Sequence, residues 1–133
     1  MNQYVPFMTS YTKPLVAASR KLIVEKVIEA LSEQGIQVFY LDGKEIYNKE
    51  TFFVKAAEVM RFPSYFGANW DAFEECVTDL TWYPAKEYNL IYERPDIFAQ
   101  ADPTNWQTGL DILRAAEEYW QTRNTQLNVF LLN

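Results

Sequence analysis

The spacing of apolar positions along the chain predicts seven elements. Apolar residues recur every three or four positions in four helical segments, at 15–34, 50–60, 70–80 and 106–122. Runs of strand length, rich in β-branched and aromatic residues, lie at 36–41, 87–93 and 127–132. Parallel strands need crossover connections, and helices between strands supply them. The order therefore predicts an α/β fold with a small, mostly parallel sheet of three strands.

Glycine and proline mark where these elements end. Gly35 is a plausible stop for the first helix, and the turn pair Asp42-Gly43 ends the first strand. Residues 1–14 show no period and are expected to form an irregular arm lying on the body. Residues 99–108 are polar, with proline and glycine in or beside them, and are expected to form a loop.

The length of the chain indicates the number of domains, and its net charge indicates the kind of partner. The 133 residues fit one domain, and the formal net charge is −6, with no histidine. A nucleic-acid backbone attracts clustered Lys and Arg, so this balance argues against nucleic-acid binding and favours a basic partner. The absence of histidine removes the commonest general base and the commonest metal ligand.

The single cysteine and the charge pattern indicate a compartment. Cys76 has no second cysteine to pair with and is expected to be a small buried apolar residue in a reducing environment. The start of the chain lacks a basic segment followed by an apolar run, and charges interrupt the later apolar stretches too often for a membrane span. We therefore expect a cytoplasmic protein. The sequence leaves its oligomeric state open.

The segment 70–80 concentrates negative charge on one side of a predicted helix. Asn69 is a suitable N-cap for this helix. Its buried stripe is expected to contain Phe73, Cys76, Val77 and Leu80. Its outward stripe is expected to contain Asp71, Glu75 and Asp79, with Glu74 beside it. No Lys or Arg occurs between residues 62 and 85.

A solvated helix face is the ordinary interpretation of such a run. The helix dipole favours Asp71 in the first turn but opposes Asp79 near the end, and like charges four residues apart repel. The stripe therefore destabilises the isolated helix, and a positively charged partner is the simplest compensation. Tyr65 precedes the helix, and an exposed tyrosine beside a charged face is typical of protein interfaces.

The stretch FPSYFGANWDAFEECVTDL, residues 62–80, resembles the central motif of the barstar family of intracellular ribonuclease inhibitors. The family's form of this segment reads P-x-Y-Y-G-x-N-x-D-A-x-x-D-C-x-T. The chain matches it without gaps at Pro63, Tyr65, Gly67, Asn69, Asp71, Ala72, Cys76 and Thr78. A Tyr-Pro pair follows in both, here at 83–84. The resemblance covers residues 36–133, and residues 1–35 are interpreted as an N-terminal arm and helix packed on the same domain.

This resemblance implies a three-layer α/β fold with a three-stranded parallel sheet, here with an extra N-terminal helix. It implies an inhibitor or immunity protein (an antitoxin), not an enzyme, with no cofactor and no metal. The loop and acidic helix would block the active site of a basic, barnase-type ribonuclease, with carboxylates in place of RNA phosphates. The expected partner-binding residues are Tyr65, Gly67, Asn69, Asp71, Glu74, Glu75, Asp79 and Glu118.

Several of these positions depart from the family pattern. Glu75 stands in place of the family's central aspartate and is one methylene longer, while Glu74 replaces an aromatic residue. Asp79 replaces a glycine, and Leu80 replaces a contact tryptophan. Glu118, with Glu117 next, is the candidate for a further family carboxylate in the last helix, where the match needs an insertion. These changes concern the identity of the target more than the mode of binding.

Two other interpretations stay open at this stage. The carboxylates Asp71 and Glu75 could hold a hard cation such as Mg²⁺, although no phosphate-binding glycine loop accompanies them. Alternatively, the fold could serve as a binding module for a different basic protein, without ribonuclease inhibition. The N-terminal helix and the changes at 74, 75 and 79 motivate that second alternative.

Overall fold

The computed structural model describes the backbone of residues 13–133 and the side chains of residues 21–133. In order, its elements are α2 (Lys13–Glu33), β1 (Ile36–Asp42), the 3-10 helix η1 (Gly43–Glu45), α3 (Lys49–Met60), α4 (Trp70–Val77), β2 (Glu87–Glu93), α5 (Asp96–Ala101), α6 (Pro103–Gln121) and β3 (Gln126–Leu132). The arm predicted for residues 1–14 lies outside the described residues, apart from the last two.

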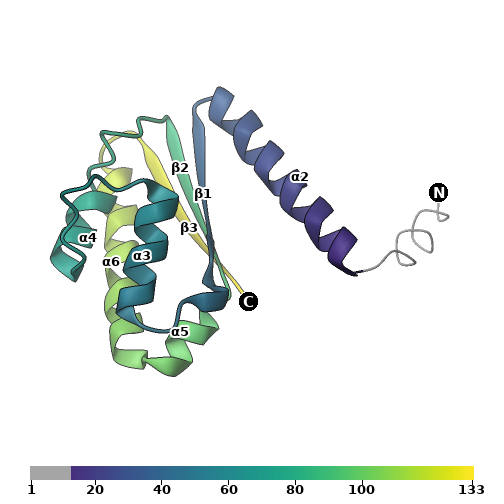
Figure 1. Ribbon diagram of the computed structural model, residues 1–133. Helices are drawn as coiled ribbons and strands as arrows, with labels where there is room; N and C mark the ends of the chain where they lie inside the picture. The colour runs from purple at the N-terminus through teal and green to yellow at the C-terminus, as the bar shows by residue number, and fades with distance from the viewer. Residues whose placement is uncertain (1–12) are drawn as a thin grey trace.

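The three strands form one parallel sheet in the order β1-β2-β3, as predicted. Phe39, Leu90 and Val129 occupy one row across the sheet, because Phe39 pairs with Leu90 and Leu90 with Val129. Helical segments connect β1 to β2 and β2 to β3, which is how parallel neighbours are joined. The connecting helices α3, α4 and α6 cover one side of the sheet, and α2 leads into β1 from the other side (Figure 1).

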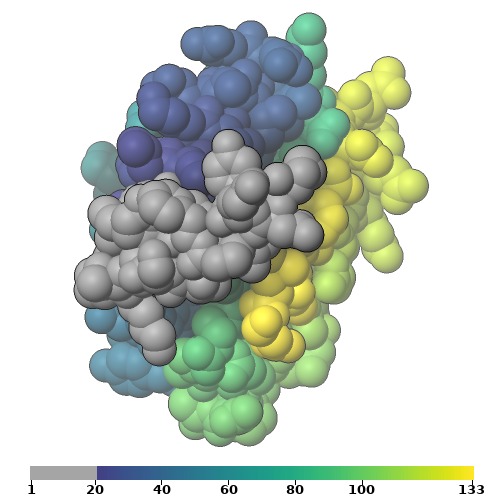
Figure 2. Space-filling model, turned by 90° about the vertical axis from the view of Figure 1, so that its right-hand side faces the viewer, coloured from purple at the N-terminus to yellow at the C-terminus, as the bar shows by residue number. Residues whose placement is uncertain are grey.

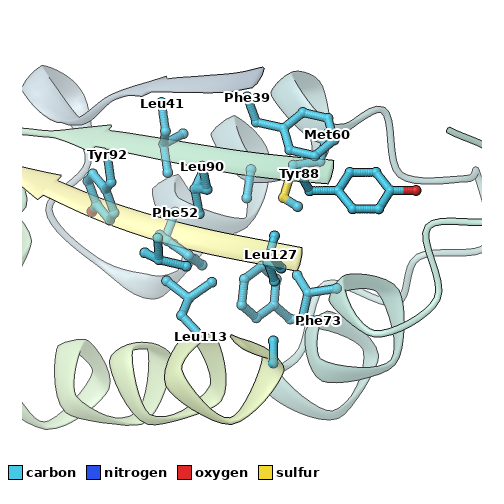
Figure 3. Packing of buried hydrophobic residues seen from close by; sticks show 14 of the residues in the cluster. Phe39, Leu41, Phe52, Met60, Phe73, Tyr88, Leu90, Tyr92, Leu113 and Leu127 are labelled. Atoms are coloured by element: carbon cyan, nitrogen blue, oxygen red, sulfur yellow. The ribbon is translucent and has the colours of Figure 1, made fainter. Parts of the chain in front are cut away.

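Helices α3, α4 and α6 lie on one side of the sheet, and the core fills the space between them and the strands (Figure 1). Alternate strand residues such as Leu41, Tyr92 and Leu127 point into this layer and are almost completely buried. Phe52 from α3, Phe73 from α4 and Leu113 from α6 meet them there (Figure 3). The apolar face of α4 is thus part of the core, which fixes where its other face points.

Helix α2 lies on the other side of the sheet and contacts β1 (Figure 1). Seen from that side, α2 and the strand β3 belong to the same face of the molecule (Figure 2). This face of the sheet is mixed in character. Asn128 donates to Asn89, Asn89 donates to Glu87, and Tyr40 bonds to Glu93. Among the described helices, none combines the length and apolar character needed to cross a membrane.

Local residue choices set the helix boundaries. Gly35 has φ +82°, in the left-handed region that favours glycine, and ends α2 as predicted. Asn48 caps α3: its side chain accepts from the backbone of Thr51, and the Thr51 hydroxyl oxygen accepts from the backbone of Asn48. Arg61 then takes a left-handed conformation and ends α3 just before the predicted break at Phe62-Pro63.

The predicted loop over residues 99–108 is wrong. This stretch contains the end of α5 and the start of α6, separated by Asp102 alone. Asp102 accepts a hydrogen bond from the backbone of Asn105 and caps α6, while Pro103 occupies the first helical turn, where its missing N–H has no consequence. Helix α6 therefore begins at Pro103, not at Trp106, and ends one residue before the predicted boundary.

Candidate functional site

Helix α4 has one buried and one exposed face, as the sequence predicted. Phe73, Cys76 and Val77 are buried in the core. Asp71, Glu74 and Glu75 are exposed on the opposite side. The structure therefore brings three of the predicted carboxylates together on one surface, and we call these three residues the acidic face.

The helix is shorter than predicted, because it ends at Val77 instead of Leu80. The hydroxyl of Thr78 donates to the carbonyl of Glu74 at 2.8 Å, and Leu80 takes a left-handed φ of +52°. Leu80 is buried, so it joins the core from the turn and not from the helix. Asp79 is exposed in the same turn and is not on the helical stripe.

The beginning of α4 is defined by its cap. The side chain of Asn69 accepts from the backbone N–H of Ala72 at 2.8 Å, which confirms the predicted N-cap. A Cβ added to Gly67 would lie 3.2 Å from the side-chain nitrogen Nδ2 of Asn69, so glycine leaves room for the capping side chain. Ala68, between them, has a φ of +52°, an uncommon conformation for a residue with a Cβ.

Neighbouring aromatic residues in the loop before α4 have opposite environments. Phe66 packs against the core, with its ring centroid 5.9 Å from that of Phe53 and 4.9 Å from that of Phe62. Tyr65 is 72% exposed. The partly buried Phe66 anchors the loop, and Tyr65 is exposed to solvent ahead of the acidic face. Its exposure agrees with an interface residue and excludes a core role.

Two indole hydrogen bonds join α4 to α6, one near each end of α4. Nε1 of Trp70 donates to the side-chain oxygen of Asn105 at 3.1 Å, and Asn105 is held in turn by Asp102. Nε1 of Trp120 donates to the carbonyl oxygen of Val77 at 2.8 Å. These bonds fix the orientation of the short α4 relative to α6, and with it the direction of the acidic face.

Gly109 has a packing role that its position in a helix conceals. It lies inside α6, and a Cβ at this position would come within 2.9 Å of the Trp70 ring. The ring of Trp70 is itself packed between Phe52 and Phe53, at centroid distances of 5.7 and 4.7 Å. Glycine therefore allows the Trp70 ring, at the start of α4, to approach α6 closely.

The acidic face has no cationic partner in the described part of the chain. The ion pairs found there join Arg94 to Asp96 and Arg114 to Glu117. The pKa of the neighbouring Cys76 thiol is raised, mainly by burial and further by the negative charges of Asp79 and Glu75. In the same described residues, no group of three or more His, Cys, Asp or Glu side chains is placed to hold a metal ion.

The two candidates on the last helix differ in their surroundings. Glu117 is engaged at the edge of the sheet, where its carboxylate accepts from the backbone N–H of Val129 at 2.8 Å and pairs with Arg114. Glu118 is exposed on α6. The predicted set thus divides into two parts: a group on α4 and in the segments just before and after it, and Glu118 on the neighbouring helix α6.

Sequence reasoning missed the residues that hold this site in place. The hydrogen bonds from Trp120 to Val77 and from Trp70 to Asn105 correspond to no sequence pattern. Gly109 was the available signal, because a glycine inside a helical pattern often marks close packing.

Comparison with known families agrees with this architecture. Residues 36–132 match the family model described as Barstar (barnase inhibitor). The chain belongs to the barstar family. The matched region runs from β1 to the end of β3, and α2 precedes it. A search of curated proteins returned no match to this chain. The barstar family is a family of inhibitors and not of enzymes.

Proposed function

We propose that this protein inhibits a basic ribonuclease by placing its acidic face and the preceding loop over the nuclease active site. The observation that carries this proposal is the set of exposed carboxylates at Asp71, Glu74 and Glu75, none of which forms an ion pair within the described residues. Such a surface destabilises the free protein slightly and gains when a cationic surface covers it. Membership of an inhibitor family supports the same conclusion.

The position of each residue suggests its role in binding the nuclease. Asp71 and Glu75 lie one helical turn apart and would pair with the cations that bind RNA phosphates in the nuclease. Tyr65, exposed ahead of them, would supply the apolar contact that anchors many interfaces. Gly67 and Asn69 would act by shaping the loop. Asp79 and Glu118 would extend the negative surface. By blocking its nuclease, the protein would act as an immunity protein.

Titration of the full chain into a barnase-type ribonuclease, followed by RNA cleavage, tests the proposal. We expect stoichiometric inhibition that weakens as salt rises, because screening reduces interactions between exposed charges. Asp71→Ala and Glu75→Ala should each lose inhibition. Glu58→Ala, an exposed carboxylate on α3, is the matched control and should inhibit like the wild type.

The outcomes separate inhibition from binding. Binding without loss of RNA cleavage would reject the nuclease plug and favour a module for another basic protein. Inhibition that survives both Asp71→Ala and Glu75→Ala would reject the acidic face as the contact surface. No binding at low salt would reject a barnase-type target.

A further inference from the structure

The strand β3 is an edge of the sheet within the described residues, because it pairs there with β2 alone. An edge strand presents backbone N–H and C=O groups that can bind a strand of another molecule. The carbonyl oxygen of Leu132 points toward β2, since it accepts from the backbone N–H of Arg94. Backbone groups alternate in direction along a strand, so those of Leu127, Val129 and Leu131 point away from β2, at the open edge.

The composition of β3 favours pairing with a copy of itself. Its sequence, QLNVFLL, contains no charged residue, no proline and no glycine, and its register with β2 runs from Gln126 to Leu132 without a bulge. Short uncharged segments of high β-propensity are those that pair with identical strands. Charges, prolines and bulges are the usual means of preventing such pairing, and β3 has none of them among its own residues. The partner that this edge fits is therefore a second copy of this protein.

Two side chains of α6 occupy the middle of this edge. A carboxylate oxygen of Glu117 accepts from the N–H of Val129 at 2.8 Å, and its other oxygen pairs with Arg114 at 2.9 Å. Arg114 in turn donates to the carbonyl oxygen of Val129 at 3.4 Å. The pair thus supplies the acceptor and the donor that one residue of a fourth strand would supply. Val129 is the central residue of β3, so the stretches left on either side are shorter than a usual strand.

We propose that Glu117, positioned by Arg114, is an edge guard that keeps β3 from pairing with β3 of a second copy of this protein. A pairing strand would have to displace the carboxylate from the N–H of Val129. Hydrogen bonds to a charged acceptor are stronger than those to a neutral carbonyl, so this exchange is unfavourable. Arg114 also places a charge beside the strand, which β3 itself lacks.

Exposed apolar side chains beside the edge increase the tendency that the guard has to oppose. Phe130 and Leu132 are 47% and 48% exposed. They lie on the face of the sheet opposite the core layer, where they would contact the equivalent residues of a second copy across a paired edge. The inference goes beyond the proposed function, because the guard acts at this edge whatever the acidic face binds.

Sedimentation velocity of the full chain over a range of concentrations tests the guard. Glu117→Ala removes the carboxylate and keeps a good helix former in α6. We expect its dimer dissociation constant to be lower than that of the wild type by about tenfold or more, since no charged acceptor has to be displaced. Glu117→Gln is the matched control: it has the same net charge as Glu117→Ala but keeps a side-chain oxygen for the N–H of Val129. Glu117→Gln should associate as weakly as the wild type.

A second substitution locates the association. Phe130→Lys, added to Glu117→Ala, places a charge on the exposed face of β3 and should return the dissociation constant to the wild-type value. Val54→Lys adds the same charge at an exposed position of α3 and should leave the association of Glu117→Ala unchanged. Urea unfolding followed by circular dichroism checks that every variant is folded.

Two results would overturn the inference. One is a Glu117→Ala chain that associates no more than Glu117→Gln, since the carboxylate would then only attach α6 to β3. The other is association that Phe130→Lys leaves unchanged, since the contact between copies would then lie elsewhere. The ribonuclease assay is read separately, because inhibition or its absence has no bearing on the edge guard.

Discussion

Replacing Trp120 by phenylalanine should loosen the C-terminal end of α4, next to Glu74 and Glu75. The substitution keeps an aromatic ring in place but removes the indole N–H that donates to the carbonyl of Val77. Val77 is completely buried, so no water is available to replace the lost donor. The change therefore tests whether this single hydrogen bond holds α4 to α6.

The expected loss of stability has two parts. The smaller ring buries less apolar area, and this costs on the order of 1 kcal/mol of stability. The unpaired carbonyl adds about 1–2 kcal/mol, the usual penalty for a buried acceptor without its partner. Trp106→Phe is the matched control, because Trp106 packs on Tyr92 and Phe98 but makes no indole hydrogen bond within the described residues. Trp106→Phe should lose only the stability that comes from the buried apolar area.

Urea unfolding followed by far-UV circular dichroism measures both variants without relying on tryptophan fluorescence. We expect Trp120→Phe to lower the free energy of unfolding by about 2–3 kcal/mol, and Trp106→Phe by about 1 kcal/mol, with unchanged m-values. Equal losses in the two variants would refute the role given to the hydrogen bond. A loss confined to Trp106→Phe would refute it more strongly.

Three further predictions concern the same region. Ala68→Gly should raise the free energy of unfolding by roughly 0.5–1 kcal/mol, because it removes the strain of an alanine in the left-handed conformation. Ala72→Gly, inside α4, is the control and should lower the free energy of unfolding by about 1 kcal/mol. Urea unfolding midpoints show whether the two changes have these opposite signs. Gly109→Ala should lower the melting temperature despite better helix propensity, because the new methyl group meets the Trp70 ring, and an unchanged or higher value would contradict that contact. Burial and neighbouring carboxylates raise the pKa of Cys76 above its ordinary 9.0, so the native thiol stays protonated where the unfolded one ionises. The stability from this group is complete below pH 9 and declines above it, and Cys76→Ala should flatten the alkaline part of the stability curve.

The strands and the α/β class could be predicted from the sequence because their signals are local. Runs such as Val38–Leu41 are apolar and bounded by turn residues, and crossover helices leave few arrangements other than a parallel sheet. The N-cap at Asn69 and the stop at Gly35 were equally readable, since each depends on one residue and its immediate neighbours.

The end of α4 and the start of α6 were predicted wrongly. Pro103 resembles a helix breaker, yet in the first turn it is well tolerated, and Gly109 is explained only by a tryptophan 39 positions earlier. Leu80 continues the apolar period of α4 but reaches the core from a left-handed turn. The sequence therefore located the acidic stripe but not the hydrogen bonds that orient it.

The most direct test of the central claim is to map where a ribonuclease touches this protein. Amide chemical shifts of the ¹⁵N-labelled full chain are recorded with and without one equivalent of a barnase-type ribonuclease. The account predicts that shifts concentrate on the loop 65–69, on α4, and on the side of α6 that faces it. Shifts centred on α2 or on the strand face beside it, or none at one equivalent, would contradict the claim that the acidic face is the binding surface.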